Sequence, residues 1–350
     1  MQMPVLFTSK TPAVHQNLTL LAADIGATKS HLALFGAEAS GLSVIQEFTY
    51  RTHDFPDASS MMRAFLSDGQ SPGRICFGVA GPVQAGTVQL TNVGWHLDAR
   101  ELSRQWHQVP VYLINDLEAT AYGLAALEEK DINLLDAVPQ QGHGNIAVIA
   151  PGTGLGEAGL FWDGGRHHPF ATEGGHTDFA PRSPTDVALY GYLQQQQEHV
   201  SWESVLSGPG IHAIFRFLRD SQKREVPAWL AEEMRLQDPA AVISKNALKS
   251  PVCAETMELF FRYLAQEAAN LTLKLKATGG LFSGGGIIRK NGHVLDKTAF
   301  RHNFCHKGRM QALLEEVPIT LVLNDKTALL GAAYYAAYGA AIPEPAGLSG

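Results

Sequence analysis

The sequence predicts an α/β protein of two domains, each built on a mixed β-sheet. The chain has 350 residues, which is long enough for two domains. Its first part has the order strand, strand, strand, helix, strand, helix, strand. This order differs from a plain alternation of strands and helices and indicates a sheet whose first three strands are antiparallel. A second strand–glycine turn–strand unit later in the chain indicates an internal duplication.

The first domain is expected to begin with an antiparallel meander that contains a glycine turn. Apolar and β-branched runs bounded by turn residues predict its strands, and a helical spacing of apolar residues predicts its helices. The expected strands are 18–24, 30–35, 43–50, 74–80, 87–90 and 111–114, and the expected helices are 57–66 and 97–106. A further helix is expected after the strand at 111–114, over 118–126.

The second domain is expected to repeat the strand–turn–strand unit and then to become helical. Its predicted strands are 145–150, 157–162, 281–283 and 319–323, and residues 164–176, rich in Gly and His, are expected to form a loop. The predicted helices are 183–196, 208–219, 227–236, 238–249, 252–276 and 327–338. We expect an N-terminal extension at 1–18, a small domain at 19–114 that includes a terminal helix at about 326–341, and a large domain at 115–325.

The composition excludes several classes of protein. The chain is 45% hydrophobic and 17% charged with a net charge of −7, and no cluster of Lys and Arg indicates nucleic-acid binding. The three cysteines are odd in number and widely spaced, which argues against a disulfide framework and fits a reducing cytosol. No apolar run is long enough to span a membrane, and residues 1–18 lack the pattern of a signal peptide. A cytoplasmic protein is therefore expected.

The stretch Val111-Tyr-Leu-Ile-Asn-Asp-Leu-Glu118 is a candidate active-site segment. A short apolar strand ends at Asn115 and Asp116, and a helix follows. An amide and a carboxylate at this junction are well placed to meet a ligand. Asp116 is a candidate base for a sugar hydroxyl, with Asn115 holding the sugar. The alternative interpretation is that Asp116 is only the N-cap of the helix.

Three glycine turns follow predicted strands and are candidate phosphate-binding turns. They are Asp24-Ile-Gly-Ala-Thr28, Pro151-Gly-Thr-Gly-Leu-Gly156 and Ser283-Gly-Gly-Gly286. Glycine lets the backbone approach an anion closely, and Thr28 and Thr153 add hydroxyl donors. Asp24 has the same sign of charge as phosphate, so it could orient the waters of a phosphate-bound Mg²⁺ instead. None of the turns has Walker A or Rossmann spacing, and each alone could be structural.

A second cluster, Glu173-Gly-Gly-His176, has side chains suited to a sugar. A carboxylate accepts hydrogen bonds from neighbouring hydroxyls, and an imidazole donates or accepts one. The two glycines are expected to leave room for the sugar ring. A zinc site formed by His167, His168 and His176 is the alternative, although these histidines lack helical i, i+4 spacing and a nearby cysteine. Glu203 precedes another glycine break.

These motifs carry a resemblance to a known family. The chain resembles the bacterial-type glucokinases, within the actin-like, hexokinase and Hsp70 ATPase superfamily, from about Leu20 to about Tyr338. The most specific of the matching runs are Glu173-Gly-Gly-His-Thr-Asp-Phe-Ala-Pro181 and Val205-Leu-Ser-Gly-Pro-Gly210. The others are the turns above, Thr91-Asn92 with Trp95, Leu113-Ile-Asn-Asp116 and Lys307-Gly-Arg309.

The resemblance implies a two-domain actin-like, ribonuclease H-like fold with a cleft. It also implies ATP, Mg²⁺, a homodimer and phosphorylation of glucose at the 6-hydroxyl to feed glycolysis. By their match to the family motifs, Asp116 would be the catalytic base, and the glucose ligands would be Asn92, Asn115, Glu173, His176 and Glu203. The phosphate and Mg²⁺ group would be Asp24, Gly26, Ala27, Thr28, Lys29, Thr153 and Gly154, and the adenosine turn Gly284 and Gly285.

The first glycine turn departs from the usual family pattern. Ala27 replaces a glycine, Lys29 an asparagine and His31 an arginine. Ala27 tolerates fewer backbone conformations than glycine, while Lys29 could add positive charge near the phosphates. These departures leave open which compound is the phosphoryl donor. Two other functions also remain open at this point: a kinase for another hexose, and a glucose-binding regulatory protein on the same fold.

Overall fold

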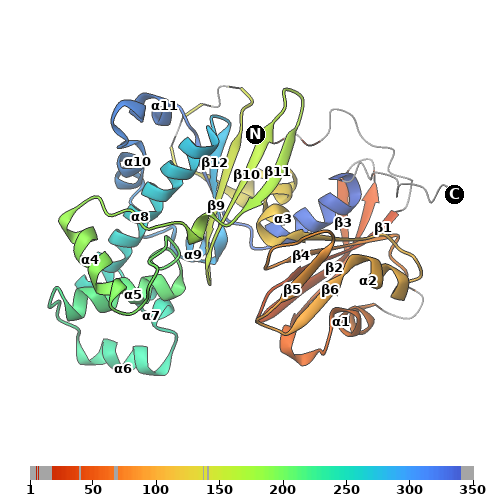
Figure 1. Cartoon of the computed structure of the whole chain (residues 1–350), viewed down its shortest axis with the longest axis horizontal. Coiled ribbons are helices and arrows are strands. Elements are labelled where there is room, and N and C mark those ends of the chain that lie inside the picture. The colour runs from red at the N-terminus through yellow and green to blue at the C-terminus, as the bar shows by residue number, and fades with distance from the viewer. Residues whose placement is uncertain are drawn as a thin grey trace. The chain divides into compact units, whose positions relative to one another are not determined.

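The computed structural model describes residues 5, 7, 18–38, 41–66, 70–136, 138–139 and 142–339. They form two compact units, which are considered separately (Figure 1). Unit 1 lies within residues 1–128, 162–171 and 326–350, and unit 2 comprises 129–161 and 172–325. This division differs from the expected boundary after residue 114. Most of the expected N-terminal extension at 1–18 and the end of the terminal helix, at 340–341, lie outside the described residues.

Unit 1 is built on a five-stranded sheet in the order β3-β2-β1-β4-β7. The predicted antiparallel meander of β1, β2 and β3 is confirmed, and β4 lies parallel to both β1 and β7. The strands are Leu18–Ile25 (β1), Lys29–Glu38 (β2), Gly41–Arg51 (β3), Arg74–Val79 (β4) and Val111–Asn115 (β7), and a separate hairpin pairs Thr87–Leu90 (β5) with Trp95–Asp98 (β6).

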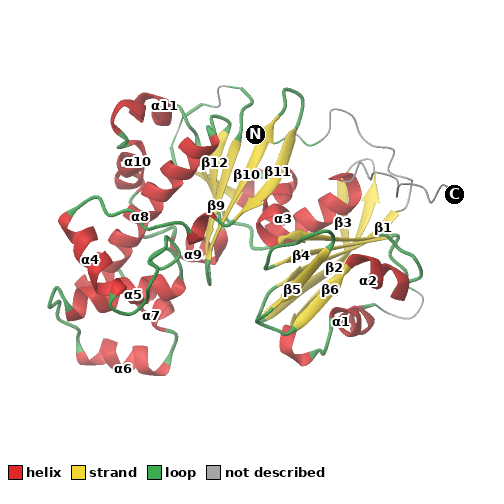
Figure 2. Ribbon diagram, in the orientation of Figure 1, coloured by secondary structure: helices red, strands yellow, loops and turns green. Residues whose placement is uncertain are grey.

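Helices pack on both faces of this sheet because successive strand side chains point to opposite sides (Figure 2). On one face, Leu21 belongs to a cluster with Met62 of α1. On the other face, Leu20 belongs to a cluster with Leu329 of α12. The helices of unit 1 are Ala58–Phe65 (α1), Ala99–Gln105 (α2), Asp116–Gly123 (α3) and Thr327–Tyr334 (α12), and α12 continues as a π-helical segment over Tyr335–Gly339.

Two glycines allow the backbones of α3 and α12 to approach each other closely. A Cβ atom on Gly331 of α12 would lie 1.7 Å from the carbonyl oxygen of Ala119 of α3. A Cβ on Gly123 of α3 would lie 2.0 Å from the carbonyl oxygen of Thr327. Any larger side chain would force the helices apart. The terminal helix therefore holds the helix that begins at Asp116.

The second sheet has six strands in the order β11-β10-β9-β12-β13-β8, and it forms the base of unit 2, although its edge strand β11 falls almost wholly within the 162–171 segment of unit 1. Its first five strands repeat the order of the unit 1 sheet: β9 pairs antiparallel with β10 and parallel with β12, as β1 does with β2 and β4. This repeat supports the predicted duplication. The strands are Ile132–Leu134 (β8), Ile146–Pro151 (β9), Leu155–Trp162 (β10), His167–Thr172 (β11), Gly280–Ser283 (β12) and Ile319–Val322 (β13).

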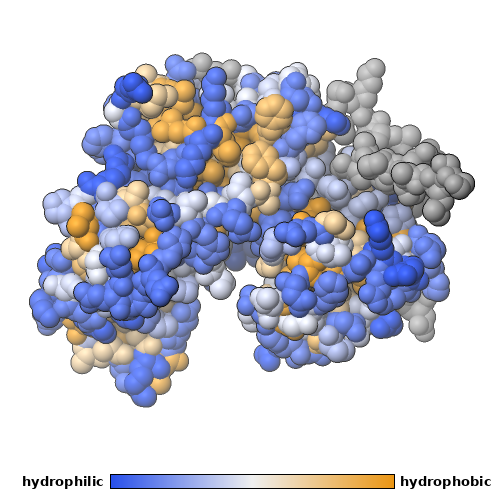
Figure 3. Space-filling model, in the orientation of Figure 1, coloured by the Kyte–Doolittle hydropathy of each residue, from blue (hydrophilic) through white to orange (hydrophobic). Residues whose placement is uncertain are grey.

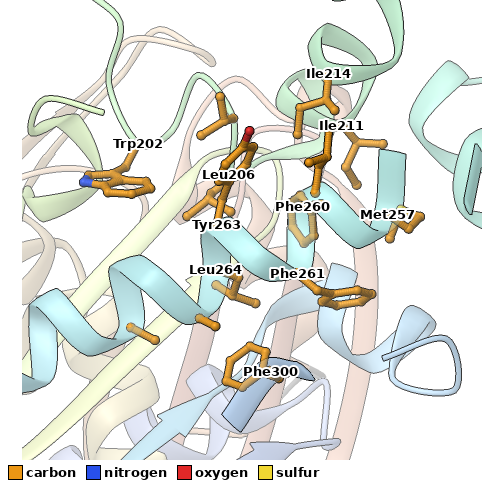
Figure 4. Close-up of a cluster of buried hydrophobic side chains, with 14 of the residues drawn as sticks. Trp202, Leu206, Ile211, Ile214, Met257, Phe260, Phe261, Tyr263, Leu264 and Phe300 are labelled. Atoms are coloured by element: carbon orange, nitrogen blue, oxygen red, sulfur yellow. The ribbon is translucent and has the colours of Figure 1, made fainter. Parts of the chain in front are cut away.

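The core of unit 2 is organised around the long helix α8. Its side chains Phe260, Tyr263 and Leu264 pack among residues from neighbouring elements, including Trp202 and Phe300 (Figure 4). The helix ends at Leu275 and is capped by Lys276, which adopts the left-handed conformation with φ of 49°. The helices of unit 2 are Pro184–Gln194 (α4), Gly208–Asp220 (α5), Ala228–Leu236 (α6), Pro239–Lys245 (α7), Pro251–Leu275 (α8), Gly285–Asn291 (α9), Lys297–Cys305 (α10) and Gln311–Glu315 (α11).

Two local predictions are wrong. Residues 164–176 are not simply a loop, because His167–Thr172 forms the edge strand β11 beside β10. The helix expected at 97–106 begins only at Ala99, because Trp95–Asp98 is strand β6. Asp98 is the N-cap, and its Oδ1 accepts hydrogen bonds from the N–H groups of Arg100 and Glu101 at 2.8 and 3.1 Å.

The surface shown in Figure 3 is mostly hydrophilic, with a gathering of apolar residues over β10 and β11. Phe161 and Phe170 on these strands are among the exposed apolar side chains. Within the described part of the chain, every helix is too short or too polar to cross a membrane.

Candidate active site

Asp24 and Asp116 lie at the carboxyl ends of β1 and β7, two parallel strands of unit 1 that flank β4. In the sheet register, Ile25 on β1 is opposite Val79 on β4, and Val79 is opposite Asn115 on β7. Asp24 therefore precedes this row and Asp116 follows it, at the edge of the sheet where ligands bind in α/β proteins. Burial, and then the negative charge of Asp116, raise the pKa of Asp24 to about 7. The two carboxylates are close enough to repel each other.

The cap of helix α3 is Asn115, and the alternative that Asp116 is the N-cap is wrong. The Oδ1 atom of Asn115 accepts hydrogen bonds from the N–H groups of Leu117 at 2.9 Å and Glu118 at 3.4 Å. Its Nδ2 group donates to the carbonyl of Gly81 at 3.2 Å. Asp116 is the first helical residue, and its Oδ1 also accepts from the Leu117 N–H, at 2.9 Å. Asn115 thus fixes the start of the helix that carries Asp116.

The turn between β1 and β2 is held by Thr52. The Thr52 hydroxyl donates to the carbonyl of Gly26 at 2.7 Å, and the Thr52 N–H donates to the carbonyl of Thr28 at 3.1 Å. The backbone of Ala27 is outside the left-handed region, so alanine fits there without strain. Thr28 and Lys29 are exposed at the tip.

The structure brings Asn92 next to this turn. Gly26, Ala27 and Asn92 line one small cavity of about 10 Å³, together with Ile25, Ala80, Leu90, Thr91 and Val93. This volume is that of a single water site. Asn92 itself is exposed. Three of the residues predicted to bind the substrates in unit 1 are therefore neighbours.

In unit 2, the glycine turn between β9 and β10 is tied to Glu203. The N–H of Gly152 donates to the carbonyl of Gly154 at 2.8 Å and closes the turn. The N–H of Leu155 donates to Oε2 of Glu203 at 2.8 Å. A Cβ on Gly154 would lie 2.4 Å from the same oxygen, so the carboxylate rests directly against the turn. Thr153 is exposed at its tip.

Glu203 is also tied to the turn that contains Glu173 and His176. The N–H of Glu203 donates to the carbonyl of Gly175 at 2.9 Å. The turn is a short 3₁₀ helix closed by a hydrogen bond from the His176 N–H to the Glu173 carbonyl at 3.0 Å. The side chains of Glu173 and His176 are exposed. Three of the predicted sugar ligands thus lie on two segments that are bonded to each other.

The prediction that the two glycines of this turn leave room for a sugar ring is wrong. A Cβ on Gly175 would lie 2.1 Å from the carbonyl oxygen of Leu155, and a Cβ on Gly174 would lie 2.0 Å from Oε2 of Glu157. Both glycines therefore face the first half of β10. They let the turn pack directly on this strand, which fixes where Glu173 and His176 are presented.

The alternative of a zinc site finds no support in the described part of the chain. There, no group of three or more His, Cys, Asp and Glu side chains could hold a metal ion. His168 instead pairs with Asp163, its Nε2 lying 2.6 Å from Oδ2, and the hydrogen bond holds the pKa of Asp163 well below its usual range. The ring of His167 packs on Trp162, with the ring centroids 4.8 Å apart.

A large cavity of about 870 Å³ adjoins the glycine turns of unit 2. It is lined on one side by Gly152 and Thr153 and on another by Gly286, which follows the predicted Gly284 and Gly285. Gly285 has φ of +85° and begins α9, while the N–H of Gly284 donates to the carbonyl of Ile149 at 2.9 Å. The volume is typical of a site for a small organic ligand.

Sequence reasoning did not find the other walls of this cavity. They include polar and charged side chains from helices α5, α7 and α9 and the residues beside them: His212, Asp238, Ser244, Lys245, Lys290 and His293. Burial, and then two nearby arginines, lower the pKa of His212. The residues come from segments far apart in the chain and share no local motif. The one local signal for this wall was the pair Asp238-Pro239, which is typical of the start of a helix and begins α7.

Two sheets of the same strand order, each with a turn after its first strand and with helices on its faces, define an actin-like ATPase fold. The chain belongs to the glucokinase family: the family model described as "Glucokinase" matches residues 21–338. The glucokinase of Nostoc punctiforme is 38% identical over 336 residues, covering 91% of this chain and 98% of that protein.

Solved structures agree with this membership. A glucokinase from an Antarctic psychrotroph is 34% identical with a TM-score of 0.79, covering 91% of this chain and 98% of that chain. A ROK family glucokinase from Streptomyces griseus, solved in complex with glucose and AMPPNP, has 22% identity and a TM-score of 0.62, with 91% and 99% of the two chains covered. The second likeness shows the fold alone.

Proposed function

We propose that the protein transfers the terminal phosphoryl group of ATP to the 6-hydroxyl of glucose. In this reaction Asp116 accepts the proton of the sugar hydroxyl as the new bond to phosphorus forms. Phosphoryl transfer needs little covalent help from the protein, so positioning and electrostatics supply most of the rate. The observation that carries the proposal is the placement of Asp116 beside Asp24, at the carboxyl ends of parallel strands, in a chain of the glucokinase family.

In unit 2, the proposed glucose ligands are Glu173, His176 and Glu203. In unit 1, the match to the family motifs gives the same proposed role to Asn92 and Asn115. Within unit 2, the hydrogen bonds between Glu203, Gly175 and Leu155 keep these ligands in one arrangement. Exposed carboxylate and imidazole groups can each bond a sugar hydroxyl. The cap role of Asn115 uses its Oδ1 and part of its Nδ2, which leaves one N–H of the amide for a ligand.

ATP would occupy the cavity of about 870 Å³, with its adenosine near Gly284 and Gly285. In unit 2, Thr153 and Gly154 would contact its phosphates. In unit 1, the match to the family motifs gives a phosphate-binding role to Gly26, Ala27, Thr28 and Lys29. The residues fit a magnesium ion, because the repulsion between Asp24 and Asp116 favours a divalent cation beside them. Asp24 would hold the ion through water. When bound, Mg²⁺ neutralises charge on the transferred phosphoryl group.

We also propose that the protein is a cytoplasmic homodimer that feeds glycolysis. Light scattering of the purified protein at several concentrations tests the dimer, and a monomeric mass at all of them would exclude it.

A coupled assay of ADP release, over glucose, mannose, fructose and an amino sugar, tests the activity. We expect release with glucose that needs both ATP and Mg²⁺. The decisive variant is Asp116→Asn, which should keep glucose binding but lose about 10²–10⁴-fold in kcat, the usual contribution of a positioned base. Glu258→Gln, which likewise changes a carboxylate to an amide at an exposed position on α8, is the matched control. A kcat within tenfold of the unchanged protein would exclude Asp116 as the base.

The same panel of sugars decides between the remaining alternatives. Faster turnover with another hexose would make the protein a kinase for that sugar. Glucose binding without ADP release, from any donor, would make it a glucose-binding regulatory protein.

A further inference from the structure

Glu157 is a buried carboxyl group that the proposed reaction does not use. It lies on β10, directly after the glycine turn, and is 1% exposed. Neither of its carboxylate oxygens has a hydrogen-bond partner among the described residues. An ionised carboxylate in such surroundings is strongly unfavourable, because nothing replaces the water that it lost. The structure therefore favours the neutral acid.

This carboxyl group supports the turn that carries Glu173 and His176. Oε2 of Glu157 lies so close to Gly174 that a Cβ there would be 2.0 Å away. The carbonyl of Glu157 accepts a hydrogen bond from the Thr172 hydroxyl at 3.1 Å, and that hydroxyl accepts one from the Gly174 N–H at 3.1 Å. The entry to the turn is thus hydrogen-bonded to the backbone carbonyl of Glu157 through Thr172, and it packs directly against the Glu157 side chain.

The charged groups around Glu157 come from helix α8 and from the turn. On α8, Glu267 is fully buried, and its carboxylate accepts hydrogen bonds from Asn270 at 2.7 Å and Lys274 at 3.3 Å. The turn contributes the exposed Glu173 and His176. Burial, and then the charge of Glu267, raise the pKa of Glu157 to about 8, while Lys274 acts in the opposite direction.

We infer that Glu157 is a positioning residue of the sugar subsite: its neutral carboxyl group holds Gly174 and the turn at 173–176 in the arrangement that binds glucose. Ionisation would require water or donors at the carboxylate. The strand and α8 are fixed in the packed core, whereas the turn lies at the surface, so the turn is the part that moves. The inference rests on the proposed role of this turn in sugar binding.

The test is the Kd for glucose, measured by titration calorimetry from about pH 7 to about pH 9.5 on the full chain and on Glu157→Gln. In the unchanged protein we expect the Kd to rise about tenfold for each pH unit above the pKa, as the neutral form disappears. In Glu157→Gln the Kd should change less than about twofold. Glu258→Gln, on the exposed side of α8, is the matched control and should behave as the unchanged protein does. An equal rise in Glu157→Gln would overturn the inference.

Amide hydrogen exchange of residues 172–177 without sugar separates this inference from the proposed function. Above about pH 8, the turn should exchange faster in the unchanged protein than in Glu157→Gln at the same pH. Equal exchange would overturn the positioning role. Absence of glucose binding in every variant would refute the proposed function, while the exchange data would still decide the role of Glu157. Glu157→Leu, which also cannot ionise, repeats the measurement if the glutamine variant fails to fold.

Discussion

Oε2 of Glu203 accepts a hydrogen bond from the backbone N–H of Leu155 at 2.8 Å, while the N–H of Glu203 bonds the carbonyl of Gly175 at 2.9 Å. One residue therefore joins the turn proposed to bind phosphate with the turn proposed to bind glucose. A change in either turn is transmitted to the other through Glu203.

We expect Glu203→Ala to weaken the binding of both glucose and ATP. A hydrogen bond to a charged group contributes about 1.5–3 kcal/mol, so the KM for ATP should rise by about tenfold or more in addition to the KM for glucose. Steady-state kinetics with both substrates varied measure the two effects. Glu203→Gln keeps an acceptor for the Leu155 N–H and should restore much of the KM for ATP. An unchanged KM for ATP in the alanine variant would contradict the connection.

Asp24→Asn should stabilise the protein while it removes activity. The pKa of Asp24 is raised to about 7, so the folded protein binds a proton more tightly than the unfolded chain does. The free energy of unfolding therefore falls as the pH rises from about 4 to about 7, and it does not recover at higher pH. At about pH 8, without Mg²⁺ or nucleotide, the asparagine variant should be more stable by about 1–3 kcal/mol.

Urea unfolding at about pH 4 and about pH 8 measures this effect. The gain should be small at the lower pH, where Asp24 is neutral in the folded protein and only about half ionised in the unfolded chain. An equal gain at the two pH values would show that ionisation of Asp24, which burial and then the charge of Asp116 disfavour, is not its cause.

Gly331→Ala should strongly destabilise unit 1. The new Cβ would lie 1.7 Å from the Ala119 carbonyl oxygen, so α12 must move away from α3. Overpacking of this kind costs about 1–3 kcal/mol or more. The control is Gly191→Ala, inside α4, where nothing lies within 4 Å of a new Cβ. That change should stabilise the chain by about 0.5–1 kcal/mol, and thermal unfolding of both variants should show opposite shifts.

Asn115 has two proposed roles that substitution can separate. Asn115→Ala removes the cap of α3 and should cost about 1 kcal/mol of stability. Asn115→Ser supplies another good capping oxygen and should recover that loss. If Asn115 also binds glucose through its amide, both variants should show the same raised KM for glucose. A serine variant with normal KM would leave the asparagine with the capping role alone.

Strands and helices with a strong hydrophobic periodicity could be predicted from the sequence. The predictions were wrong where contacts with distant parts of the chain determine the local structure. The strand β11 contains His167, His168 and Pro169, which have little strand tendency on their own, and it is stabilised by pairing with β10. Asn115 and Asp116 are both good capping residues, so the local sequence could not choose between them. The pairing of Asn115 with Val79 keeps it in β7 and makes it the cap.

The candidate site was predictable wherever a short motif carried it. The glycine turns, Asp116 and the Glu173–His176 turn are all visible as local runs. The wall of the large cavity was not, because His212, Lys245 and Lys290 meet only through folding. Glu157 looked like an ordinary strand residue. Its carboxyl group is buried without a hydrogen-bond partner among the described residues because α8 and the turn at 173–176 pack against β10.

The repeated strand order assigns equivalent places to the two turns, with Gly26 in the first sheet matching Gly152 in the second. By this match, Asp24 corresponds to Ala150, so the carboxylate exists in only one copy. A gene that encoded a single half, acting as a symmetric pair, would have presented the same side chain twice. Fusion of two copies would have allowed each turn to change independently, so that only the first strand carries an acid at this position, while the second turn has its carboxylate from Glu203, a residue outside the repeat.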